Sequence, residues 1–126
     1  MFRRFVVTGC LVVAATSLVG ASPASASLAT DWTTVSAGAG HTCAIRSTGK
    51  LYCWGNDASG QVGNGASTGN VTSPAQITSA TDWQTVGAGA NDTCAVRGKL
   101  YCWGGDGDGQ VGNGAPTGNV TSPQQV

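Results

Sequence analysis

Glutamate is absent from the sequence, histidine occurs once, and charged residues make up only 10% of the 126 residues. Six basic side chains are balanced by six acidic ones, so the formal net charge is zero. A nucleic-acid surface needs clustered lysine and arginine, which displace the counterions of the phosphate backbone. Because the chain has so little basic charge, we expect no nucleic-acid partner.

The residues that usually carry catalysis and cofactor binding are also few. A Ser-His-Asp site would need His41 beside Asp31 or Asp57 and an activated serine, and we expect none. The glycine-rich stretches are not followed by the lysine and helix of a phosphate-binding loop. Asp106 and Asp108 alternate as calcium ligands do, but no glutamate follows them, so we interpret this segment as a solvated turn. The sequence predicts no enzyme activity, no cofactor and no bound metal.

An uncharged, mostly apolar run, Phe5 to Val19, follows two arginines and precedes the small residues Ala24-Ser25-Ala26. This order of segments is typical of a secretory signal peptide. Its 15 residues fall short of the roughly 20 that span a bilayer, which favours a cleaved signal over a retained anchor. We therefore predict a helical signal at residues 1–26 and a secreted product, extracellular or in the cell envelope, without stable membrane insertion after cleavage.

Little material for a hydrophobic core remains after this segment. Removing 26 of the 126 residues leaves 100, which contain 18 of the 20 glycines and few large aliphatic residues. Four of the five cysteines also remain. An even number of cysteines in an exported chain indicates disulfides, which help to stabilise a small domain.

An internal repeat dominates the remaining sequence. Asp31 to Ala39 recurs as Asp82 to Ala90 at a shift of 51 residues, and Trp54 to Ile77 recurs as Trp103 to Val126 at a shift of 49. A period near 50 residues is typical of propeller blades or solenoid coils. The predicted repeats are residues 27–81 and 82–126.

Within each repeat the pattern is that of β-strands. In residues 42–54, apolar residues alternate with others on both sides of a three-residue turn at 47–49. Counting outward from this turn places Cys43 opposite Cys53, and directly opposed β-carbons lie about 4.5–5.5 Å apart, close to disulfide reach. A zinc site is the competing interpretation, but the spacing is not the C-x2-C type and export favours oxidation. The predicted disulfides are Cys43–Cys53 and Cys94–Cys102.

Two further sets of residues are candidates for structural and binding roles. His41 precedes the first hairpin, and Asp92 stands at the same place in the second repeat. This change indicates a variable loop position and not a preserved catalytic site, and a histidine at a strand end that bonds to backbone is favoured over a catalytic one. We also predict that His41 and Asp92 belong to a rim that contacts a partner. The tryptophans recur at the repeat spacing, which favours packing between blades over a sugar-binding platform. They are Trp32, Trp54, Trp83 and Trp103.

The order of these motifs closely resembles the regulator of chromosome condensation repeat family. The first repeat reads A-G-A-G-H-T-C-A-I, K-L-Y-C-W-G-N, G-Q-V-G-N-G and S-P-A-Q-I, and the second repeat has a near copy of each motif. The resemblance implies an all-β fold of four-stranded propeller blades, typically seven in a closed ring. Two repeats predict two blades of an incomplete ring. We expect either self-association through open blade edges or a fragment of a longer sequence.

The resemblance also implies a function in binding. Members of this family usually bind another protein through their rim loops. Exported relatives include a β-lactamase inhibitor protein, and nuclear relatives are guanine nucleotide exchange factors. We therefore predict an exported protein-interaction scaffold or inhibitor-like module with an unknown protein partner. The alternatives are a role like that of the exchange factors, or the non-catalytic repeat part of a secreted or wall-associated enzyme.

Overall fold

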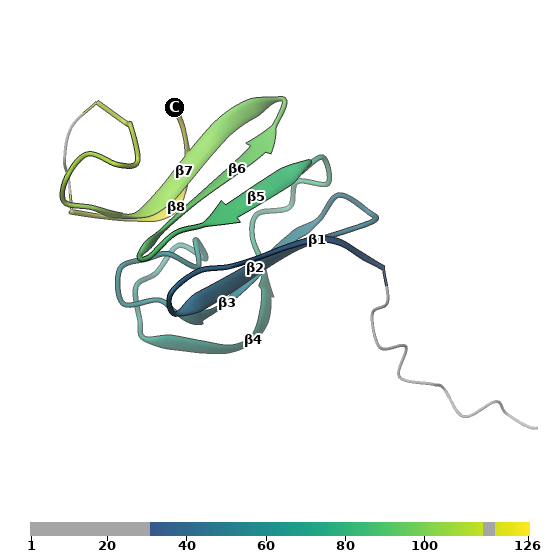
Figure 1. Ribbon diagram of the computed structural model, residues 1–126, viewed down its shortest axis with the longest axis horizontal. Coiled ribbons are helices and arrows are strands. Elements are labelled where there is room, and N and C mark those ends of the chain that lie inside the picture. Colours follow the sequence, from purple (N-terminus) through teal and green to yellow (C-terminus); the bar gives the residue numbers. More distant parts are fainter. Residues whose placement is uncertain (1–30, 115–117) are drawn as a thin grey trace, which may run out of the picture.

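The computed structural model describes residues 31–114 and 118–126, so the predicted signal at residues 1–26 lies outside the described residues. These residues form two four-stranded antiparallel sheets, which we call blade 1 and blade 2 (Figure 1). Blade 1 consists of β1 (Trp32–Ala37), β2 (His41–Arg46), β3 (Leu51–Asn56) and β4 (Asn70–Gln76). Blade 2 consists of β5 (Thr85–Ala88), β6 (Asp92–Arg97), β7 (Lys99–Asp106) and β8 (Gly118–Gln125). The predicted all-β fold of two four-stranded blades is confirmed.

In each blade the strands follow one another in sequence order across the sheet. Each strand therefore pairs with the next along the chain, as in a meander of hairpins. No helix in the described part of the chain is long and apolar enough to cross a membrane.

The central hairpin of each blade has the register that the turn length predicts. In blade 1, Ile45 lies opposite Leu51 and Cys43 opposite Cys53. Gly49 makes the turn with a φ of 72°, a conformation in which any other residue is strained. The structure contains both disulfides, Cys43–Cys53 and Cys94–Cys102, each with a Cα–Cα distance of 4.1 Å.

Alternation along the strands gives each blade two different faces. The disulfide face carries the cysteines and the aliphatic residues beside them. The aromatic face carries three rings in edge or tilted contact. In blade 1 these rings are Trp32, Tyr52 and Trp54, and in blade 2 they are Trp83, Tyr101 and Trp103.

The core lies between the blades, where the disulfide face of blade 1 packs against the aromatic face of blade 2. Cys43, Ile45 and Leu51 from blade 1 are buried in the same hydrophobic cluster as Trp83 and Trp103 from blade 2. We call this contact the internal joint. A single blade has too few large side chains to bury its own faces, so the joint supplies most of the apolar packing.

The disulfide pairing is directly testable. Digestion of the chain without reductant is expected to yield the peptide of Cys43 joined to that of Cys53, and the peptide of Cys94 joined to that of Cys102. Closing a loop of about ten residues stabilises the fold by roughly 2–3 kcal/mol in the chain-entropy model, so reduction should lower the melting temperature. A peptide that joins Cys43 to Cys94 would contradict the assignment.

Candidate functional site

A buried polar centre organises the internal joint. The backbone carbonyl of Gln61, in the loop between β3 and β4, accepts hydrogen bonds from Thr93 Oγ1 at 2.8 Å and Trp103 Nε1 at 3.0 Å. Thr93 Oγ1 also lies 2.7 Å from Nε2 of His41. All four residues are buried. The centre therefore joins β2 and the loop of blade 1 to β6 and β7 of blade 2.

The hydrogen count of this centre fixes the tautomer of His41. A hydroxyl has a single hydrogen, and that of Thr93 is donated to the Gln61 carbonyl. Thr93 must therefore accept from His41, which places a proton on Nε2. Nδ1 of His41 is buried without a partner. Burial lowers the pKa of His41, while the nearby carboxylates of Asp92 and Asp57 act in the opposite direction.

We expect the joint to weaken as the solution is acidified below about pH 6.5, the ordinary pKa of histidine. Because the lowered pKa keeps His41 neutral in the folded chain, only the unfolded chain takes up this proton just below that pH. The free energy of unfolding should therefore fall with the pH in this window and level off below the folded-state pKa. Urea unfolding of the wild type and of His41→Gln at a series of pH values measures the effect. The same pH dependence in both proteins would argue against a role for His41.

The loop that carries Gln61 is shaped by a buried carboxylate. Oδ1 of Asp57 accepts the backbone N–H of Val62 at 3.0 Å, and in blade 2 Oδ1 of Asp106 accepts that of Val111 at 2.9 Å. Burial raises the pKa of Asp57. Asp106 is also buried, whereas Asp108 is exposed. The interpretation of this segment as a solvated turn was therefore wrong for Asp106, whose carboxylate holds the loop together.

The structure separates the two residues that the sequence assigned to a binding rim. His41 is 3% exposed and lies in the internal joint, at the first position of β2. Its hydrogen-bond partner is a side chain, not the backbone. Asp92 is half-buried at the start of β6. Of this pair, only Asp92 is partly exposed at the surface.

The neighbouring glycine-rich loops do form a common rim. The loop at residues 38–40 lies beside the loop at 89–91, and Ala39 donates its backbone N–H to the carbonyl of Gly89 at 3.1 Å. Ala39, Ala90 and Asn91 are exposed. We call these two segments the rim loops.

One serine of the chain lies in a sequence pattern that catalytic nucleophiles use. Residues 65–69 read G-A-S-T-G, which matches the G-x-S-x-G letters of a nucleophile elbow. An elbow needs a strand followed by a helix, but this segment lies in the loop between β3 and β4, where Ser67 is exposed. His41 is engaged with Thr93 in the joint. The pattern and the histidine therefore do not assemble into a catalytic site.

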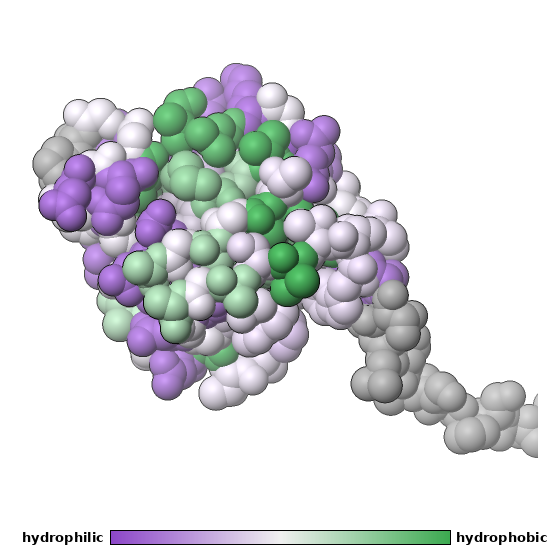
Figure 2. Space-filling model, viewed as in Figure 1, coloured by the Kyte–Doolittle hydropathy of each residue, from purple (hydrophilic) through white to green (hydrophobic). Residues whose placement is uncertain are grey.

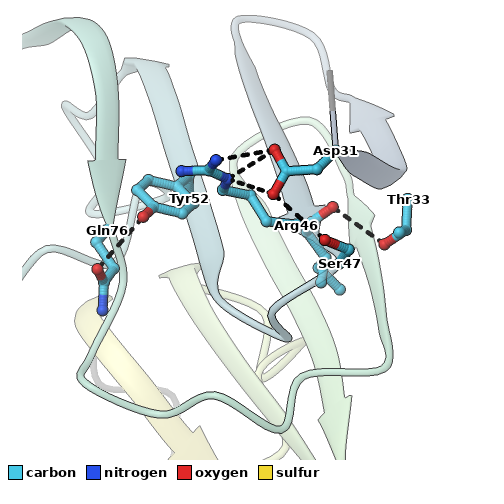
Figure 3. A network of polar contacts seen from close by, with 7 residues as sticks. Asp31, Thr33, Arg46, Ser47, Tyr52 and Gln76 are labelled. Carbon is cyan, nitrogen blue, oxygen red and sulfur yellow. Dashed lines mark hydrogen bonds and ion pairs between the residues drawn. The ribbon is translucent and has the colours of Figure 1, made fainter. Parts of the chain in front are cut away.

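At the other end of blade 1, an ion pair fixes the start of β1 (Figure 3). Nη2 of Arg46 lies 2.9 Å from Oδ1 of Asp31, and this contact lowers the pKa of the Asp31 carboxyl. The Arg46 guanidinium also lies over the ring of Trp32, 5.8 Å from its centroid. Blade 2 repeats the arrangement, because Arg97 pairs with Asp82 and lies over Trp83. The network is thus part of each blade's framework.

In the described ranges, 31–114 and 118–126, there is no pocket and no group of three or more side chains placed to hold a metal ion. Sequence models described as Regulator of chromosome condensation (RCC1) repeat match residues 32–61 and 48–96. The chain belongs to the RCC1 repeat family. It contains two such repeats, and the resemblance seen in the sequence is confirmed.

Solved structures agree with this RCC1 assignment. Prp20p from Saccharomyces cerevisiae is 23% identical to the chain with a TM-score of 0.69, over 75% of this chain and 25% of Prp20p. Human WBSCR16 is 23% identical with a TM-score of 0.65, over 75% of this chain and 25% of WBSCR16. Yeast RCC1 (Prp20) bound by Kap60 is 22% identical with a TM-score of 0.69, over 75% of this chain and 24% of that chain.

The RCC1 repeats of this chain thus span about a quarter of the length of these solved relatives. At these identities the likeness shows the fold alone. No curated protein sequence matches the chain.

Proposed function

We propose that this RCC1-repeat chain is an exported protein-interaction module that binds a protein, and not a nucleic acid, through its rim loops. The observation that carries the proposal is the pair of adjoining rim loops on an RCC1-repeat fold whose described residues form no pocket. A ligand would then be recognised on a surface and not in a cleft, which is how proteins recognise one another. An inhibitor-like module is the finer form of this proposal.

The exposed small residues of the rim favour close approach by a partner's side chains. Ala39, Ala90 and Asn91 are exposed, and the half-buried Asp92 adds an acidic group at the edge. The published description of Prp20p concerns its binding to Gsp1p and histones. With 23% identity, the likeness carries the fold, so neither partner is assigned to this chain.

Binding can be tested with a substitution in the rim and a matched one away from it. The exported chain serves as bait for secreted and envelope proteins of its own source, and a captured protein is purified and titrated by calorimetry. Ala90→Arg should weaken binding at least tenfold, whereas Thr48→Arg, in the exposed turn between β2 and β3, should not. Equal binding by both variants would refute the rim-loop site. The absence of any saturable protein ligand would refute the module.

Export has an experiment of its own. Fusion of residues 1–26 to a reporter that becomes active only outside the cytoplasm should give an active product, because these residues have the pattern of a signal peptide. Activity no greater than that of the reporter without these residues would contradict export and leave the binding test unaffected.

A further inference from the structure

The internal joint covers one face of each blade and leaves the other face open. Four large hydrophobic residues are exposed among the described residues, and all four belong to these open faces. Trp32 is 37% and Val35 68% exposed on the aromatic face of blade 1. Leu100 is 42% exposed on the disulfide face of blade 2, and Val126, whose N–H bonds to the Leu100 carbonyl, is 52% exposed. Figure 2 shows hydrophobic residues gathered over blade 2 on the visible side.

Each exposed residue has a counterpart that the internal joint covers. Trp83, the counterpart of Trp32, is 4% exposed, and Leu51 and Ile77, the counterparts of Leu100 and Val126, are both 0% exposed. Val86, the counterpart of Val35, packs against the core. The two open faces are therefore the two complementary halves of the joint that already exists inside the chain.

We propose that the disulfide face of blade 2 docks onto the aromatic face of blade 1 of a second copy of the chain, reproducing the internal joint head to tail. This goes beyond the proposed function, because the surface is a pair of blade faces and the partner is the chain itself. Such a contact joins two different patches, so it extends to further copies and closes into a ring where the rotation allows.

The aromatic half of the proposed contact already has the geometry of the joint. Trp32 and Tyr52 lie 5.5 Å apart between ring centroids, and their counterparts in the joint lie 5.6 Å apart. The distance from Trp32 to Trp54 is 6.3 Å, as it is from Trp83 to Trp103. Thr42 and Trp54 are cross-strand partners on this face, as Thr93 and Trp103 are in blade 2.

The acceptor half is preformed as well. In blade 1, the loop around Gln61 is held by the Asp57 contact to Val62 and by a bond from Ser59 N to Gln61 Oε1 at 2.8 Å. In blade 2, Asp106 binds Val111 in the same way, and Asp108 N donates to Gln110 Oε1 at 2.9 Å. Gln110 is exposed where Gln61 is buried. The backbone carbonyl of Gln110 would accept hydrogen bonds from Thr42 Oγ1 and Trp54 Nε1 of the second copy.

Two positions make the contact between copies weaker than the internal joint. His41 donates to Thr93, but its counterpart Asp92 is a carboxylate with no proton to donate, so the single hydrogen of Thr42 would face two acceptors. Oγ of Ser36 accepts the N–H of Ala88 at 2.9 Å across the joint, and the counterpart of Ser36 is Gly87, which has no side chain. Self-association is therefore expected to be reversible, and substitutions that restore the two missing groups should strengthen it.

Analytical ultracentrifugation of the full chain after export, over protein concentrations up to about 1 mM, tests the proposal. The average mass of the wild type should rise with concentration. Trp54→Ala should raise the dissociation constant at least tenfold, because it removes a ring and a donor. Gly112→Ala should do the same, since its counterpart Gly63 lies against Trp103 in the internal joint.

A repaired contact provides the opposite test. The double variant Gly87→Ser with Asp92→His restores both missing groups and should lower the dissociation constant at least tenfold; Asp92→Ala, which removes the charge without adding a donor, should gain less. The proposal is overturned if the wild type and the repaired variant both stay monomeric throughout. It is also overturned if Trp54→Ala associates as tightly as the wild type, since the occupied surface would then be a different one.

Discussion

Trp103→Ala is expected to lower the free energy of unfolding by about 3–5 kcal/mol, the usual cost of removing a fully buried tryptophan. The side chain is buried in the internal joint, and its Nε1 donates to the Gln61 carbonyl at 3.0 Å. Small domains are stable by only about 5–15 kcal/mol in total. The substitution should therefore remove much of the stability of the pair of blades.

Trp54→Ala is the matched control, because Trp54 holds the same place in blade 1 but is only half-buried. In dilute solution, where copies are dissociated, its cost should be less than half that of Trp103→Ala. Urea unfolding followed by circular dichroism measures both. Trp103→Phe, which keeps one ring but loses the N–H and part of the buried volume, should remain folded and lose less stability than Trp103→Ala. Equal losses for the two alanine variants would mean that the joint does not hold the blades together.

The contrast between these two tryptophans marks the limit of the repeat pattern. Strand alternation and turn length suffice to place Cys43 opposite Cys53, because both are local properties of one hairpin. They give Trp54 and Trp103 the same role. The structure makes the two unequal, because only Trp103 has a blade packed against its face. The face of a repeat that becomes covered depends on the neighbouring blade. The sequence of a single repeat does not encode the position of that neighbour.

The polar residues of the joint were harder to place from the sequence for a related reason. His41 was assigned to a rim because Asp92 replaces it in the second repeat, yet its partner Thr93 lies 52 residues away in sequence. Asp57 and Asp106 look like surface residues, since aspartate is rarely fully buried. The available signal was their recurrence five residues before Val62 and Val111, the residues whose N–H groups they bind.

The tightest contact of the joint leads to the second large effect. We expect Gly63→Ala to cost about 2–5 kcal/mol, of which about 1–2 kcal/mol is backbone strain, because Gly63 has a φ of 81°. The remaining 1–3 kcal/mol is overpacking. A β-carbon at Gly63 would overlap Nε1 of Trp103 and lie 2.8 Å from its Cδ1. The indole is buried and bonded to Gln61, so relief of the overlap would lengthen that hydrogen bond.

Gly112→Ala separates the two contributions. Gly112 has a φ of 76°, so the backbone strain is nearly the same, but a β-carbon there would lie no closer than 3.2 Å to a neighbouring atom, Cγ1 of Val126. Urea unfolding in dilute solution should therefore show a loss for Gly63→Ala that exceeds the loss for Gly112→Ala by about 1–3 kcal/mol. The indole N–H resonance of Trp103 should shift only in the Gly63 variant. Equal losses would mean that the loop yields without moving the tryptophan, and the joint would then tolerate a side chain where the repeat has glycine.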